Sequence, residues 1–339
     1  MNCKGCLKEI KEEQLCNKCR KELFDGKKVS LQLDFGPPDN GENMELIKNL
    51  QHISISGVQV KYSLKRENKK LVLTESGGQY ILKPVPIGLF QKLDQAPANE
   101  HLTMQIARQV YKIPAAACAM VSFNNGTPAY LTRRFDVKAD GSRSQQEDFA
   151  QLAQLNDHNS GPNYKYDYSY EEAAELIKKH VVSYRLELET FFKIVIFNYL
   201  FNNGDAHLKN FSVYLTEYGD YLLTPAYDLL NTKIHLPNDT DFALHKGLFK
   251  DDFRTESYKV NAFYAFDDFL EFGKRIGIAE ARTHKVIEGF TGFPNEVKDL
   301  IDKSFLNTEN KEKYLALFND KLSAINYSFL NLKGKKSTI

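Results

Sequence analysis

The alternation of apolar and polar residues predicts strands in the first part of the chain. It follows a Ser/Gly turn in HISISGVQVKYSL (52–64) and recurs in LVLTESGGQYILK (71–83), which predicts a hairpin through Gly77 and Gly78. A further strand is predicted in YLTRRFD (130–136). We therefore expect a strand-rich region before residue 137.

Apolar residues at helical spacing dominate the rest of the chain. NEHLTMQIARQVY (99–111) predicts one helix, SYEEAAELIKKHV (169–181) predicts another that begins at Ser169, and residues 263–332 predict a packed bundle. A buried helix is predicted from seven apolar residues that share one face: Leu188, Phe191, Phe192, Val195, Ile196, Tyr199 and Leu200. The second region is therefore expected to be helical.

Composition agrees with a globular cytoplasmic enzyme. The chain has 339 residues, 42% of them hydrophobic, and a formal net charge of +1, which gives no global field to attract nucleic acid or an anionic membrane. The longest apolar run, around residues 191–201, is too short to span a bilayer, so no membrane association is expected. Four of the five cysteines lie within the first twenty residues, which is typical of a metal site in a reducing compartment.

The spacing of polar residues after the buried helix suggests phosphoryl transfer. Asp205 and Asn210 stand five positions apart in NNGDAHLKN, two short strands are predicted at 211–215 and 220–224, and Asp228 follows. Kinases use one loop acid for the acceptor hydroxyl, and an amide and a second acid beyond a hairpin as magnesium ligands. The alternative is ordinary turn chemistry, for which Asn, Gly, Asp and His are common.

The strand-rich region supplies candidates for an ATP site. Lys83 ends a predicted strand, the position from which kinases hold phosphates, and Glu100 lies in the first turn of the next predicted helix, where its partner is expected. The alternatives are a solvated surface lysine and a glutamate that favours a helix N-terminus.

Two C-x-x-C pairs at the start of the chain predict a small cysteine knuckle. Cys3, Cys6, Cys16 and Cys19 present four thiols, which suits tetrahedral Zn²⁺, and so short a segment forms no core of its own. Redox pairing and unliganded thiols are the alternatives. Cys118 is expected in the core.

The motifs together resemble the HipA family of bacterial serine/threonine kinases, the toxins of type II toxin–antitoxin systems. The resemblance rests on SISGVQVK, ILKP, NEHLTMQIA, RRFD, QEDFAQL, GDAHLKNFSVYL and LTPAYDLLNT, which occur in the expected order. It implies an α+β, two-lobed protein-kinase-like fold. We expect a cysteine knuckle at 1–30, a linker at 31–50, an ATP-binding lobe at 51–136 and a helical catalytic lobe at 137–332.

The resemblance also implies roles for individual residues. Asp205 would be the catalytic base, His207 a neighbour of the γ-phosphate, Asn210 and Asp228 the Mg²⁺ ligands, and Lys83 a phosphate contact with Glu100 as its partner.

Further nucleotide contacts are implied in two segments. Arg133 and Phe135 would belong to the hinge that receives adenine. The loop before the first strand would cover ATP and be autophosphorylated, with both serines as candidates: Ser54, Ser56, Gly57 and Gln59.

Two departures limit what the resemblance implies. The loop contains no G-x-G-x-x-G, and Leu229 and Leu230 follow Asp228 where many protein kinases have D-F-G. The chain resembles short variants of the family, because only about fifty residues precede the Ser/Gly loop where longer members have an additional subdomain.

The partners expected from the resemblance are a protein substrate, for which an aminoacyl-tRNA synthetase is one candidate, and a HipB-like antitoxin through which DNA would be contacted indirectly. Three other functions stay open at this point: a pseudokinase or nucleotide-binding interaction module, a kinase of a lipid or another small molecule, and a kinase effector exported to a host cell.

Overall fold

The computed structural model describes residues 1–11, 14–37, 60–88, 90–138 and 140–330. The chain divides into two compact units. The first comprises Met1–Arg143, Tyr227–Asp239 and Glu296–Tyr314, and the second comprises Ser144–Ala226, Thr240–Asn295 and Leu315–Ile339.

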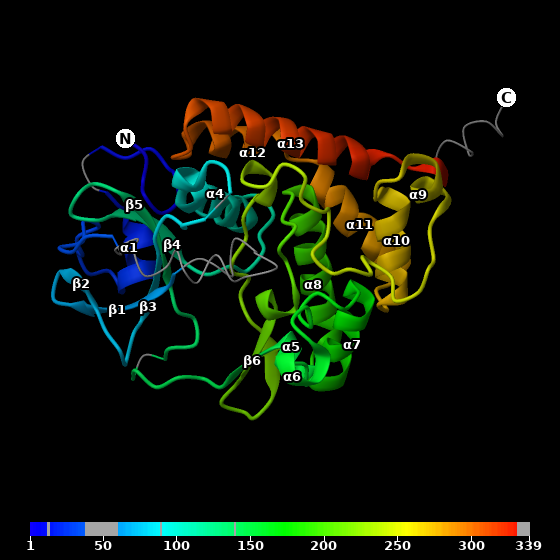
Figure 1. Cartoon of the computed structure of the whole chain (residues 1–339), viewed down its shortest axis with the longest axis horizontal. Helices are drawn as coiled ribbons and strands as arrows, with labels where there is room; N and C mark the ends of the chain where they lie inside the picture. Colours follow the sequence, from blue (N-terminus) through cyan, green and yellow to red (C-terminus); the bar gives the residue numbers. More distant parts are fainter. Residues whose placement is uncertain (12–13, 38–59, 89, 139, 331–339) are drawn as a thin grey trace. The chain divides into compact units, whose positions relative to one another are not determined.

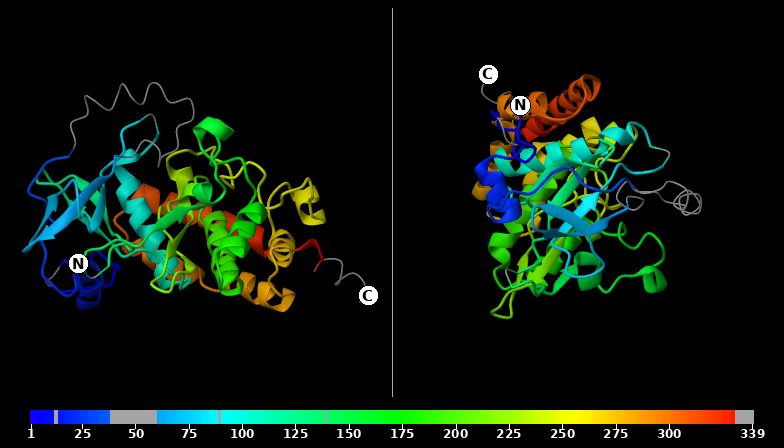
Figure 2. Two further views of the ribbon diagram at one scale, coloured as in Figure 1. Left: turned by 90° about the horizontal axis from the view of Figure 1, so that it is seen from below. Right: turned by 90° about the vertical axis from the view of Figure 1, so that its left-hand side faces the viewer.

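The first unit is built on a five-stranded sheet with the order β2-β1-β3-β5-β4, in which every neighbouring pair is antiparallel (Figures 1 and 2). The strands are β1 (Tyr62–Glu67), β2 (Lys70–Leu73), β3 (Tyr80–Lys83), β4 (Cys118–Ser122) and β5 (Pro128–Arg133). Strand β3 lies in the middle of the sheet, which explains why its last residue, Lys83, is only 3% exposed.

The hairpin predicted at 71–83 is wrong. Strands β2 and β3 do not pair with each other, because β1 lies between them and pairs with both. The tight turn instead joins β1 to β2 at Asn68, whose φ of 54° is in the left-handed region that asparagine tolerates. Gly77 and Gly78 lie in the longer connection that passes from β2 over to β3.

Helix α4 (Ala96–Gln109) is present as predicted but begins earlier, after the short 3₁₀ turn η1 (Leu93–Gln95). Pro97 lies in its first turn, where a missing backbone N–H costs nothing. Glu100 therefore lies in the second turn, which corrects the expected first-turn position. Nearly all of α4 is buried, so the helix is a central element of the first unit.

The N-terminal residues share one hydrophobic core with the sheet. Helix α1 (Asn17–Phe24) contributes Leu23 and Phe24 to this core, which also contains Leu64, Leu82 and Leu131 from the strands. The residues after α1 run beside β4, since Leu33 N donates to Ser122 O and Ser122 N donates to Leu31 O, both at 2.8–2.9 Å. The knuckle is thus packed on the sheet.

The second unit is largely helical. Its helices are α5 (Phe149–Leu152), α6 (Asp157–Ser160), α7 (Tyr170–His180), α8 (Tyr184–Leu200), α9 (Glu256–Asn261), α10 (Phe266–Arg275) and α11 (Glu280–Thr291). Helix α12 (Pro294–Lys303) and the first turns of α13 (Thr308–Asn326) belong mainly to the first unit. The predicted start of α7 is confirmed, because Ser169 and Glu172 form a reciprocal capping box.

A three-stranded sheet with the order β6-β7-β8 carries the predicted second hairpin. Strand β6 (Gln146–Asp148) pairs with β7 (Ser212–Leu215), and β7 pairs with β8 (Tyr221–Leu223) so that Val213 faces Leu223. This hairpin is confirmed. In the sequence, this hairpin follows the loop at 202–210 and precedes the segment that begins at Tyr227.

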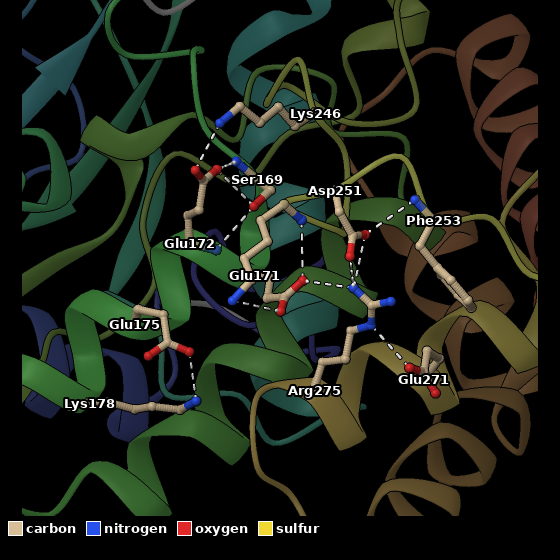
Figure 3. Close-up of polar contacts among 11 residues, drawn as sticks. Ser169, Glu171, Glu172, Glu175, Lys178, Lys246, Asp251, Phe253, Glu271 and Arg275 are labelled. Atoms are coloured by element: carbon tan, nitrogen blue, oxygen red, sulfur yellow. Dashed lines mark hydrogen bonds and ion pairs between the residues drawn. The ribbon is translucent and has the colours of Figure 1, made fainter.

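A charged network around the buried Glu171 carboxylate connects helices α7 and α10 in the second unit (Figure 3). The Glu171 carboxylate, 5% exposed, accepts from Arg275 Nη1 at 3.4 Å and from the backbone N–H of Lys250 at 3.2 Å. Arg275 also pairs with Asp251 at 2.9 Å and Glu271 at 3.0 Å. This network fixes the loop around residue 250 against the helices.

In the described part of the chain, none of the helices combines the length and the apolar character needed to cross a membrane.

Candidate functional site

Lys83 is the centre of a charged cluster in the first unit. Its Nζ lies 2.6 Å from Glu100 Oε1 and 2.5 Å from Asp228 Oδ1. Lys61, just before β1, adds a second cation at 3.3 Å from Asp228 Oδ2. The structure thus brings together three of the residues selected from the sequence and a fourth that was not.

The charges of this cluster are interdependent. Burial lowers the pKa of Lys83, but the Asp228 and Glu100 carboxylates outweigh burial and hold that pKa above its ordinary value. Burial raises the pKa of Asp228, but the positive charges of Lys83 and Lys61 outweigh the effect of burial. The pKa of Asp228 therefore lies below its ordinary range. Burial also raises the pKa of Glu100, which Lys83 opposes. The dominant ionic pair is therefore Lys83 with Asp228.

The backbone around Asp228 is held by helix α4. Asn99 Nδ2 donates to Asn231 O at 2.8 Å, and Asn231 N donates back to Asn99 Oδ1 at 3.0 Å. Asn99 Nδ2 also lies 2.9 Å from His235 Nε2. Asp228 has a φ of 55°, a left-handed conformation that costs free energy in a residue with a side chain and is concentrated at functional sites.

In the second unit, Asp205, His207 and Asn210 lie on one tight loop after helix α8. His207 N donates to Asp205 O at 2.9 Å, and Asn210 N donates to His207 O at 2.9 Å. Asp205 is 8% exposed, and its Oδ1 accepts from Tyr166 Oη at 3.2 Å. The ring of Tyr166 contacts His207 edge to face at 5.2 Å, so the loop is fixed by both backbone and side-chain contacts.

Asn210 offers a suitable oxygen for a metal ion. Its Oδ1 is buried and has no hydrogen-bond partner among the residues that the structure describes. A buried oxygen without a partner is costly, and a hard cation such as Mg²⁺ would satisfy it. The Asn210 amide oxygen is a donor type that magnesium accepts, and the carboxylate of Asp228 in the first unit is another such donor type.

The four N-terminal thiols form a metal-sized cluster. The sulfur atoms of Cys3, Cys6, Cys16 and Cys19 all lie within 4.8 Å of one another, and all are free thiols. Hydrogen bonds from Cys19 and Cys6 lower the pKa of Cys3, and the contacts of Cys19 with Cys3 and Cys6 raise the pKa of Cys19. The amide N–H of Cys16 donates to Cys3 Sγ at 3.2 Å. Four sulfurs at this spacing could hold a metal ion.

The hinge candidates lie at the end of β5. The Arg133 side chain pairs with Asp25 at 2.7 Å, and its backbone N–H donates to Ala117 O at 2.8 Å. The ring of Phe135 lies 5.8 Å from that of Tyr227. The Arg133 amide and guanidinium are thus engaged within the first unit.

The loop candidates Ser54, Ser56, Gly57 and Gln59 lie outside the described residues. Cys118, expected in the core, is buried, and Gln105 Nε2 donates to its sulfur at 3.2 Å.

Sequence reasoning missed Lys61, Tyr166 and Asn99. Lys61 lies two residues after Gln59, and its position next to the Ser/Gly loop was the one sequence feature that could have indicated it. Asn99 directly precedes Glu100. Tyr166 lies in a tyrosine-rich stretch with no motif, so nothing in the sequence singled it out.

A strand-rich unit with a buried Lys–Glu pair and a helical unit with the Asp-x-x-x-x-Asn loop define a protein-kinase-like fold. The model of the HipA-like C-terminal domain matches residues 53–296, so the chain belongs to this family. The expected resemblance and fold class are confirmed.

Curated relatives carry kinase names. The chain is 27% identical over 289 residues to a protein named "Putative kinase" from Haemophilus influenzae, covering 81% of this chain and 82% of the relative. It is 29% identical over 229 residues to "Putative kinase Y4dM" from Sinorhizobium fredii, covering 62% of this chain and 53% of that protein. The family and its named relatives point to kinase activity.

Two solved structures share the fold. The HipA protein in the Shewanella oneidensis complex of HipA, HipB and operator DNA matches with a TM-score of 0.59 and 21% identity, covering 84% of this chain and 70% of that one. The Helicobacter pylori proinflammatory kinase CtkA matches with a TM-score of 0.51 and 15% identity, covering 80% of this chain and 92% of that one.

Proposed function

We propose that this protein is a serine/threonine protein kinase that transfers the γ-phosphoryl group of ATP to a serine hydroxyl. The observation that carries the proposal is the buried contact of Lys83 with both Glu100 and Asp228, at 2.6 and 2.5 Å. A buried lysine between two acids is the arrangement with which kinases hold phosphates and the metal-binding acid. Family membership gives this geometry its context.

In the proposed reaction, the serine Oγ attacks the γ-phosphorus in line while the bond to the β,γ-bridging oxygen breaks. The serine proton passes to the Asp205 carboxylate, ADP leaves, and a phosphoserine forms. Tyr166, at 3.2 Å, orients the Asp205 carboxylate, and His207 lies beside it with its Nε2 3.9 Å from Oδ1.

Lys83 binds phosphate oxygens in this proposal, and Glu100 keeps its ammonium in place. Asn210 and Asp228 are the proposed ligands of Mg²⁺, which when bound neutralises charge on the phosphates. Before nucleotide arrives, Lys83 and Lys61 compensate the Asp228 charge. Phe135 and the backbone at the end of β5 are assigned to adenine.

We also propose that Ser54 or Ser56 accepts phosphate from the enzyme itself and that Gly57 and Gln59 contact nucleotide. A phosphate there would add a charge of about −1.5 to −2, and the repulsion from ATP would switch the enzyme off. The remaining cofactor assignment is Zn²⁺ at Cys3, Cys6, Cys16 and Cys19, because thiolates select zinc in reducing compartments.

In the cell, the proposed role is a growth-arresting toxin in the cytoplasm with a HipB-like antitoxin. This role is supported by the fold that the chain shares with the Shewanella HipA protein, whose structure was solved in complex with HipB and operator DNA. The protein substrate, with an aminoacyl-tRNA synthetase as one candidate, belongs to the same proposal. Expression of active and inactive forms in a growing culture tests it: arrest by both forms would exclude a kinase toxin.

The test of the chemistry compares the wild-type chain with Asp205→Asn, using Mg²⁺ and radiolabelled ATP. Asp252→Asn is the matched control, since Asp252 is an exposed acid of the same unit. Label on the 51–59 segment of the wild type and the control, lost in Asp205→Asn, supports the proposal. Bound ATP without any transfer favours a pseudokinase, and equal label in all three proteins refutes Asp205 as the base.

A further inference from the structure

Three consecutive residues of helix α4 point to three different parts of the first unit. Asn99 donates a hydrogen bond to Asn231 O, and Glu100 pairs with Lys83. The His101 ring forms a hydrogen bond with Gly5 O in the cysteine knuckle at 1–30. Neighbouring residues on a helix are about 100° apart around its axis, so three consecutive side chains reach separate surroundings. The orientation of α4 therefore connects the lysine cluster with the knuckle.

The contact of His101 with the knuckle is a buried hydrogen bond. Its Nε2 lies 2.7 Å from Gly5 O, and His101 is 0% exposed. A carbonyl oxygen only accepts, so Nε2 carries the proton. Loss of this acceptor would leave a buried donor unsatisfied, which is among the costlier changes in a protein interior.

Further along α4, two more side chains contact the cysteine knuckle. Gln109 Nε2 donates to Cys6 O at 2.9 Å, and Arg108 pairs with Glu22 at 2.6 Å. The acceptors Gly5 O and Cys6 O both lie in the first C-x-x-C segment. Their positions depend on what holds the two C-x-x-C segments together.

The knuckle is shaped around the sulfur cluster. A Cβ at Gly5 would lie 2.7 Å from Cys19 Sγ, so this position requires a residue without a side chain. Cys6 Sγ and Cys16 Sγ are 3.6 Å apart, whereas a disulfide needs about 2.05 Å. Weak thiol contacts are the only bonds between the sulfurs themselves, and a tetrahedral ion would replace them with strong ones.

We propose that Zn²⁺ held by Cys3, Cys6, Cys16 and Cys19 fixes the Gly5 and Cys6 carbonyls and thereby positions helix α4. His101 and Gln109 are positioning residues, and Glu100 is the group whose place they determine. Only the expected effect on phosphate transfer rests on the proposed kinase function. The zinc-dependent order of α4 stands independently of it.

The first experiment measures zinc content and amide hydrogen exchange on the full-length protein. The variants are Cys6→Ser with Cys16→Ser, and Cys118→Ser as a control at the one other cysteine. Wild type and control should contain about one zinc per chain, and the double variant should lose it. Exchange should then rise in peptides from α4 but not in those from α8. Absence of zinc, or zinc loss that leaves α4 exchange unchanged, would overturn the proposal.

The second experiment keeps the cysteines and changes only the hydrogen bond between His101 and Gly5 O. It tests the proposal even if the double cysteine variant fails to fold. His101→Gln keeps a donor near the Nε2 position, and His101→Phe removes it. The Phe variant should retain zinc, show faster exchange in α4, and transfer phosphate about 10 to 100 times more slowly through kcat. The Gln variant should resemble the wild type.

Identical exchange in the two His101 variants would refute the coupling. If the wild type transfers no phosphate, the kinase proposal fails, and the zinc and exchange results still decide the coupling.

Discussion

Lys83 and Glu100 form an ion pair with 2.6 Å between Nζ and Oε1, and neither side chain is more than 5% exposed. An isolated charge at such a depth would be very unfavourable, so each group depends on the other. Asp228 completes the cluster at 2.5 Å from the same nitrogen. The position of Lys83 is therefore determined from two sides before any nucleotide binds.

We expect Glu100→Gln to reduce phosphate transfer about 100-fold while the protein remains folded. Glutamine keeps the shape but removes the charge, so Lys83 would shift towards Asp228. Unfolding in urea should show a loss of roughly 1–3 kcal/mol, the cost of breaking a buried charged contact. Glu309→Gln, which breaks the exposed pair with Lys92, should change neither quantity appreciably. Full transfer by Glu100→Gln would argue against the role of the pair.

Lys61→Met is expected to slow transfer by about tenfold. Lys61 contacts Asp228 at 3.3 Å, and its loss would leave the carboxylate free to reorient around Lys83. Lys65→Met is the matched control, because Lys65 pairs only with exposed Glu67 as far as the described residues show. Steady-state transfer rates of the three proteins at saturating ATP provide the measurement, and equal rates would rule Lys61 out as a support of Asp228.

Gly273→Ala should destabilise the second unit by about 1–3 kcal/mol. A Cβ at Gly273 in α10 would overlap the Thr283 side chain of α11, which is fully buried. Gly289→Ala is the control within α11, since a Cβ there meets nothing within 4 Å. That change should be neutral or stabilise by up to about 1 kcal/mol. Thermal unfolding distinguishes them, and equal melting temperatures would contradict the packing described.

The Glu189 pair should give a pH-dependent contribution to stability. Hydrogen bonds from Arg282 hold the pKa of Glu189 at about 2, below the value near 4.5 of an unperturbed glutamate. The folded pKa is depressed, so the contribution is complete above pH 4.5 and disappears as the pH falls through about 2. Solvent screening limits it to about 1 kcal/mol or less.

The corresponding measurement is the free energy of unfolding of wild type and Glu189→Gln between pH 6 and pH 2.5. The difference between them should shrink towards the acid end, and Arg282→Gln should reproduce only part of it, because Lys193 still pairs with Glu189 at 2.6 Å. A difference that stays constant or grows on acidification would show that the pair acts through packing alone.

The sequence predicted the individual helices and strands better than it predicted which strands pair with each other. Ser169 with Glu172 predicted the start of α7, and the two short segments at 211–215 and 220–224 predicted the hairpin of β7 and β8, because these signals are local. Strands β2 and β3 were predicted correctly as strands, but their separation by β1 depends on contacts distant in sequence. Lys61 was missed for the same reason, since only the fold brings it to Asp228.

The shared core of the knuckle and the sheet affects how the protein is made. Cys3 and Cys19 are buried by a core that includes Leu131, which is synthesised more than a hundred residues after Cys19. At about 5–20 residues per second, the ribosome needs roughly 5–20 seconds to reach it. During this interval the core that later covers Cys3 and Cys19 is incomplete, so the proposed metal ion can bind before that core closes over it.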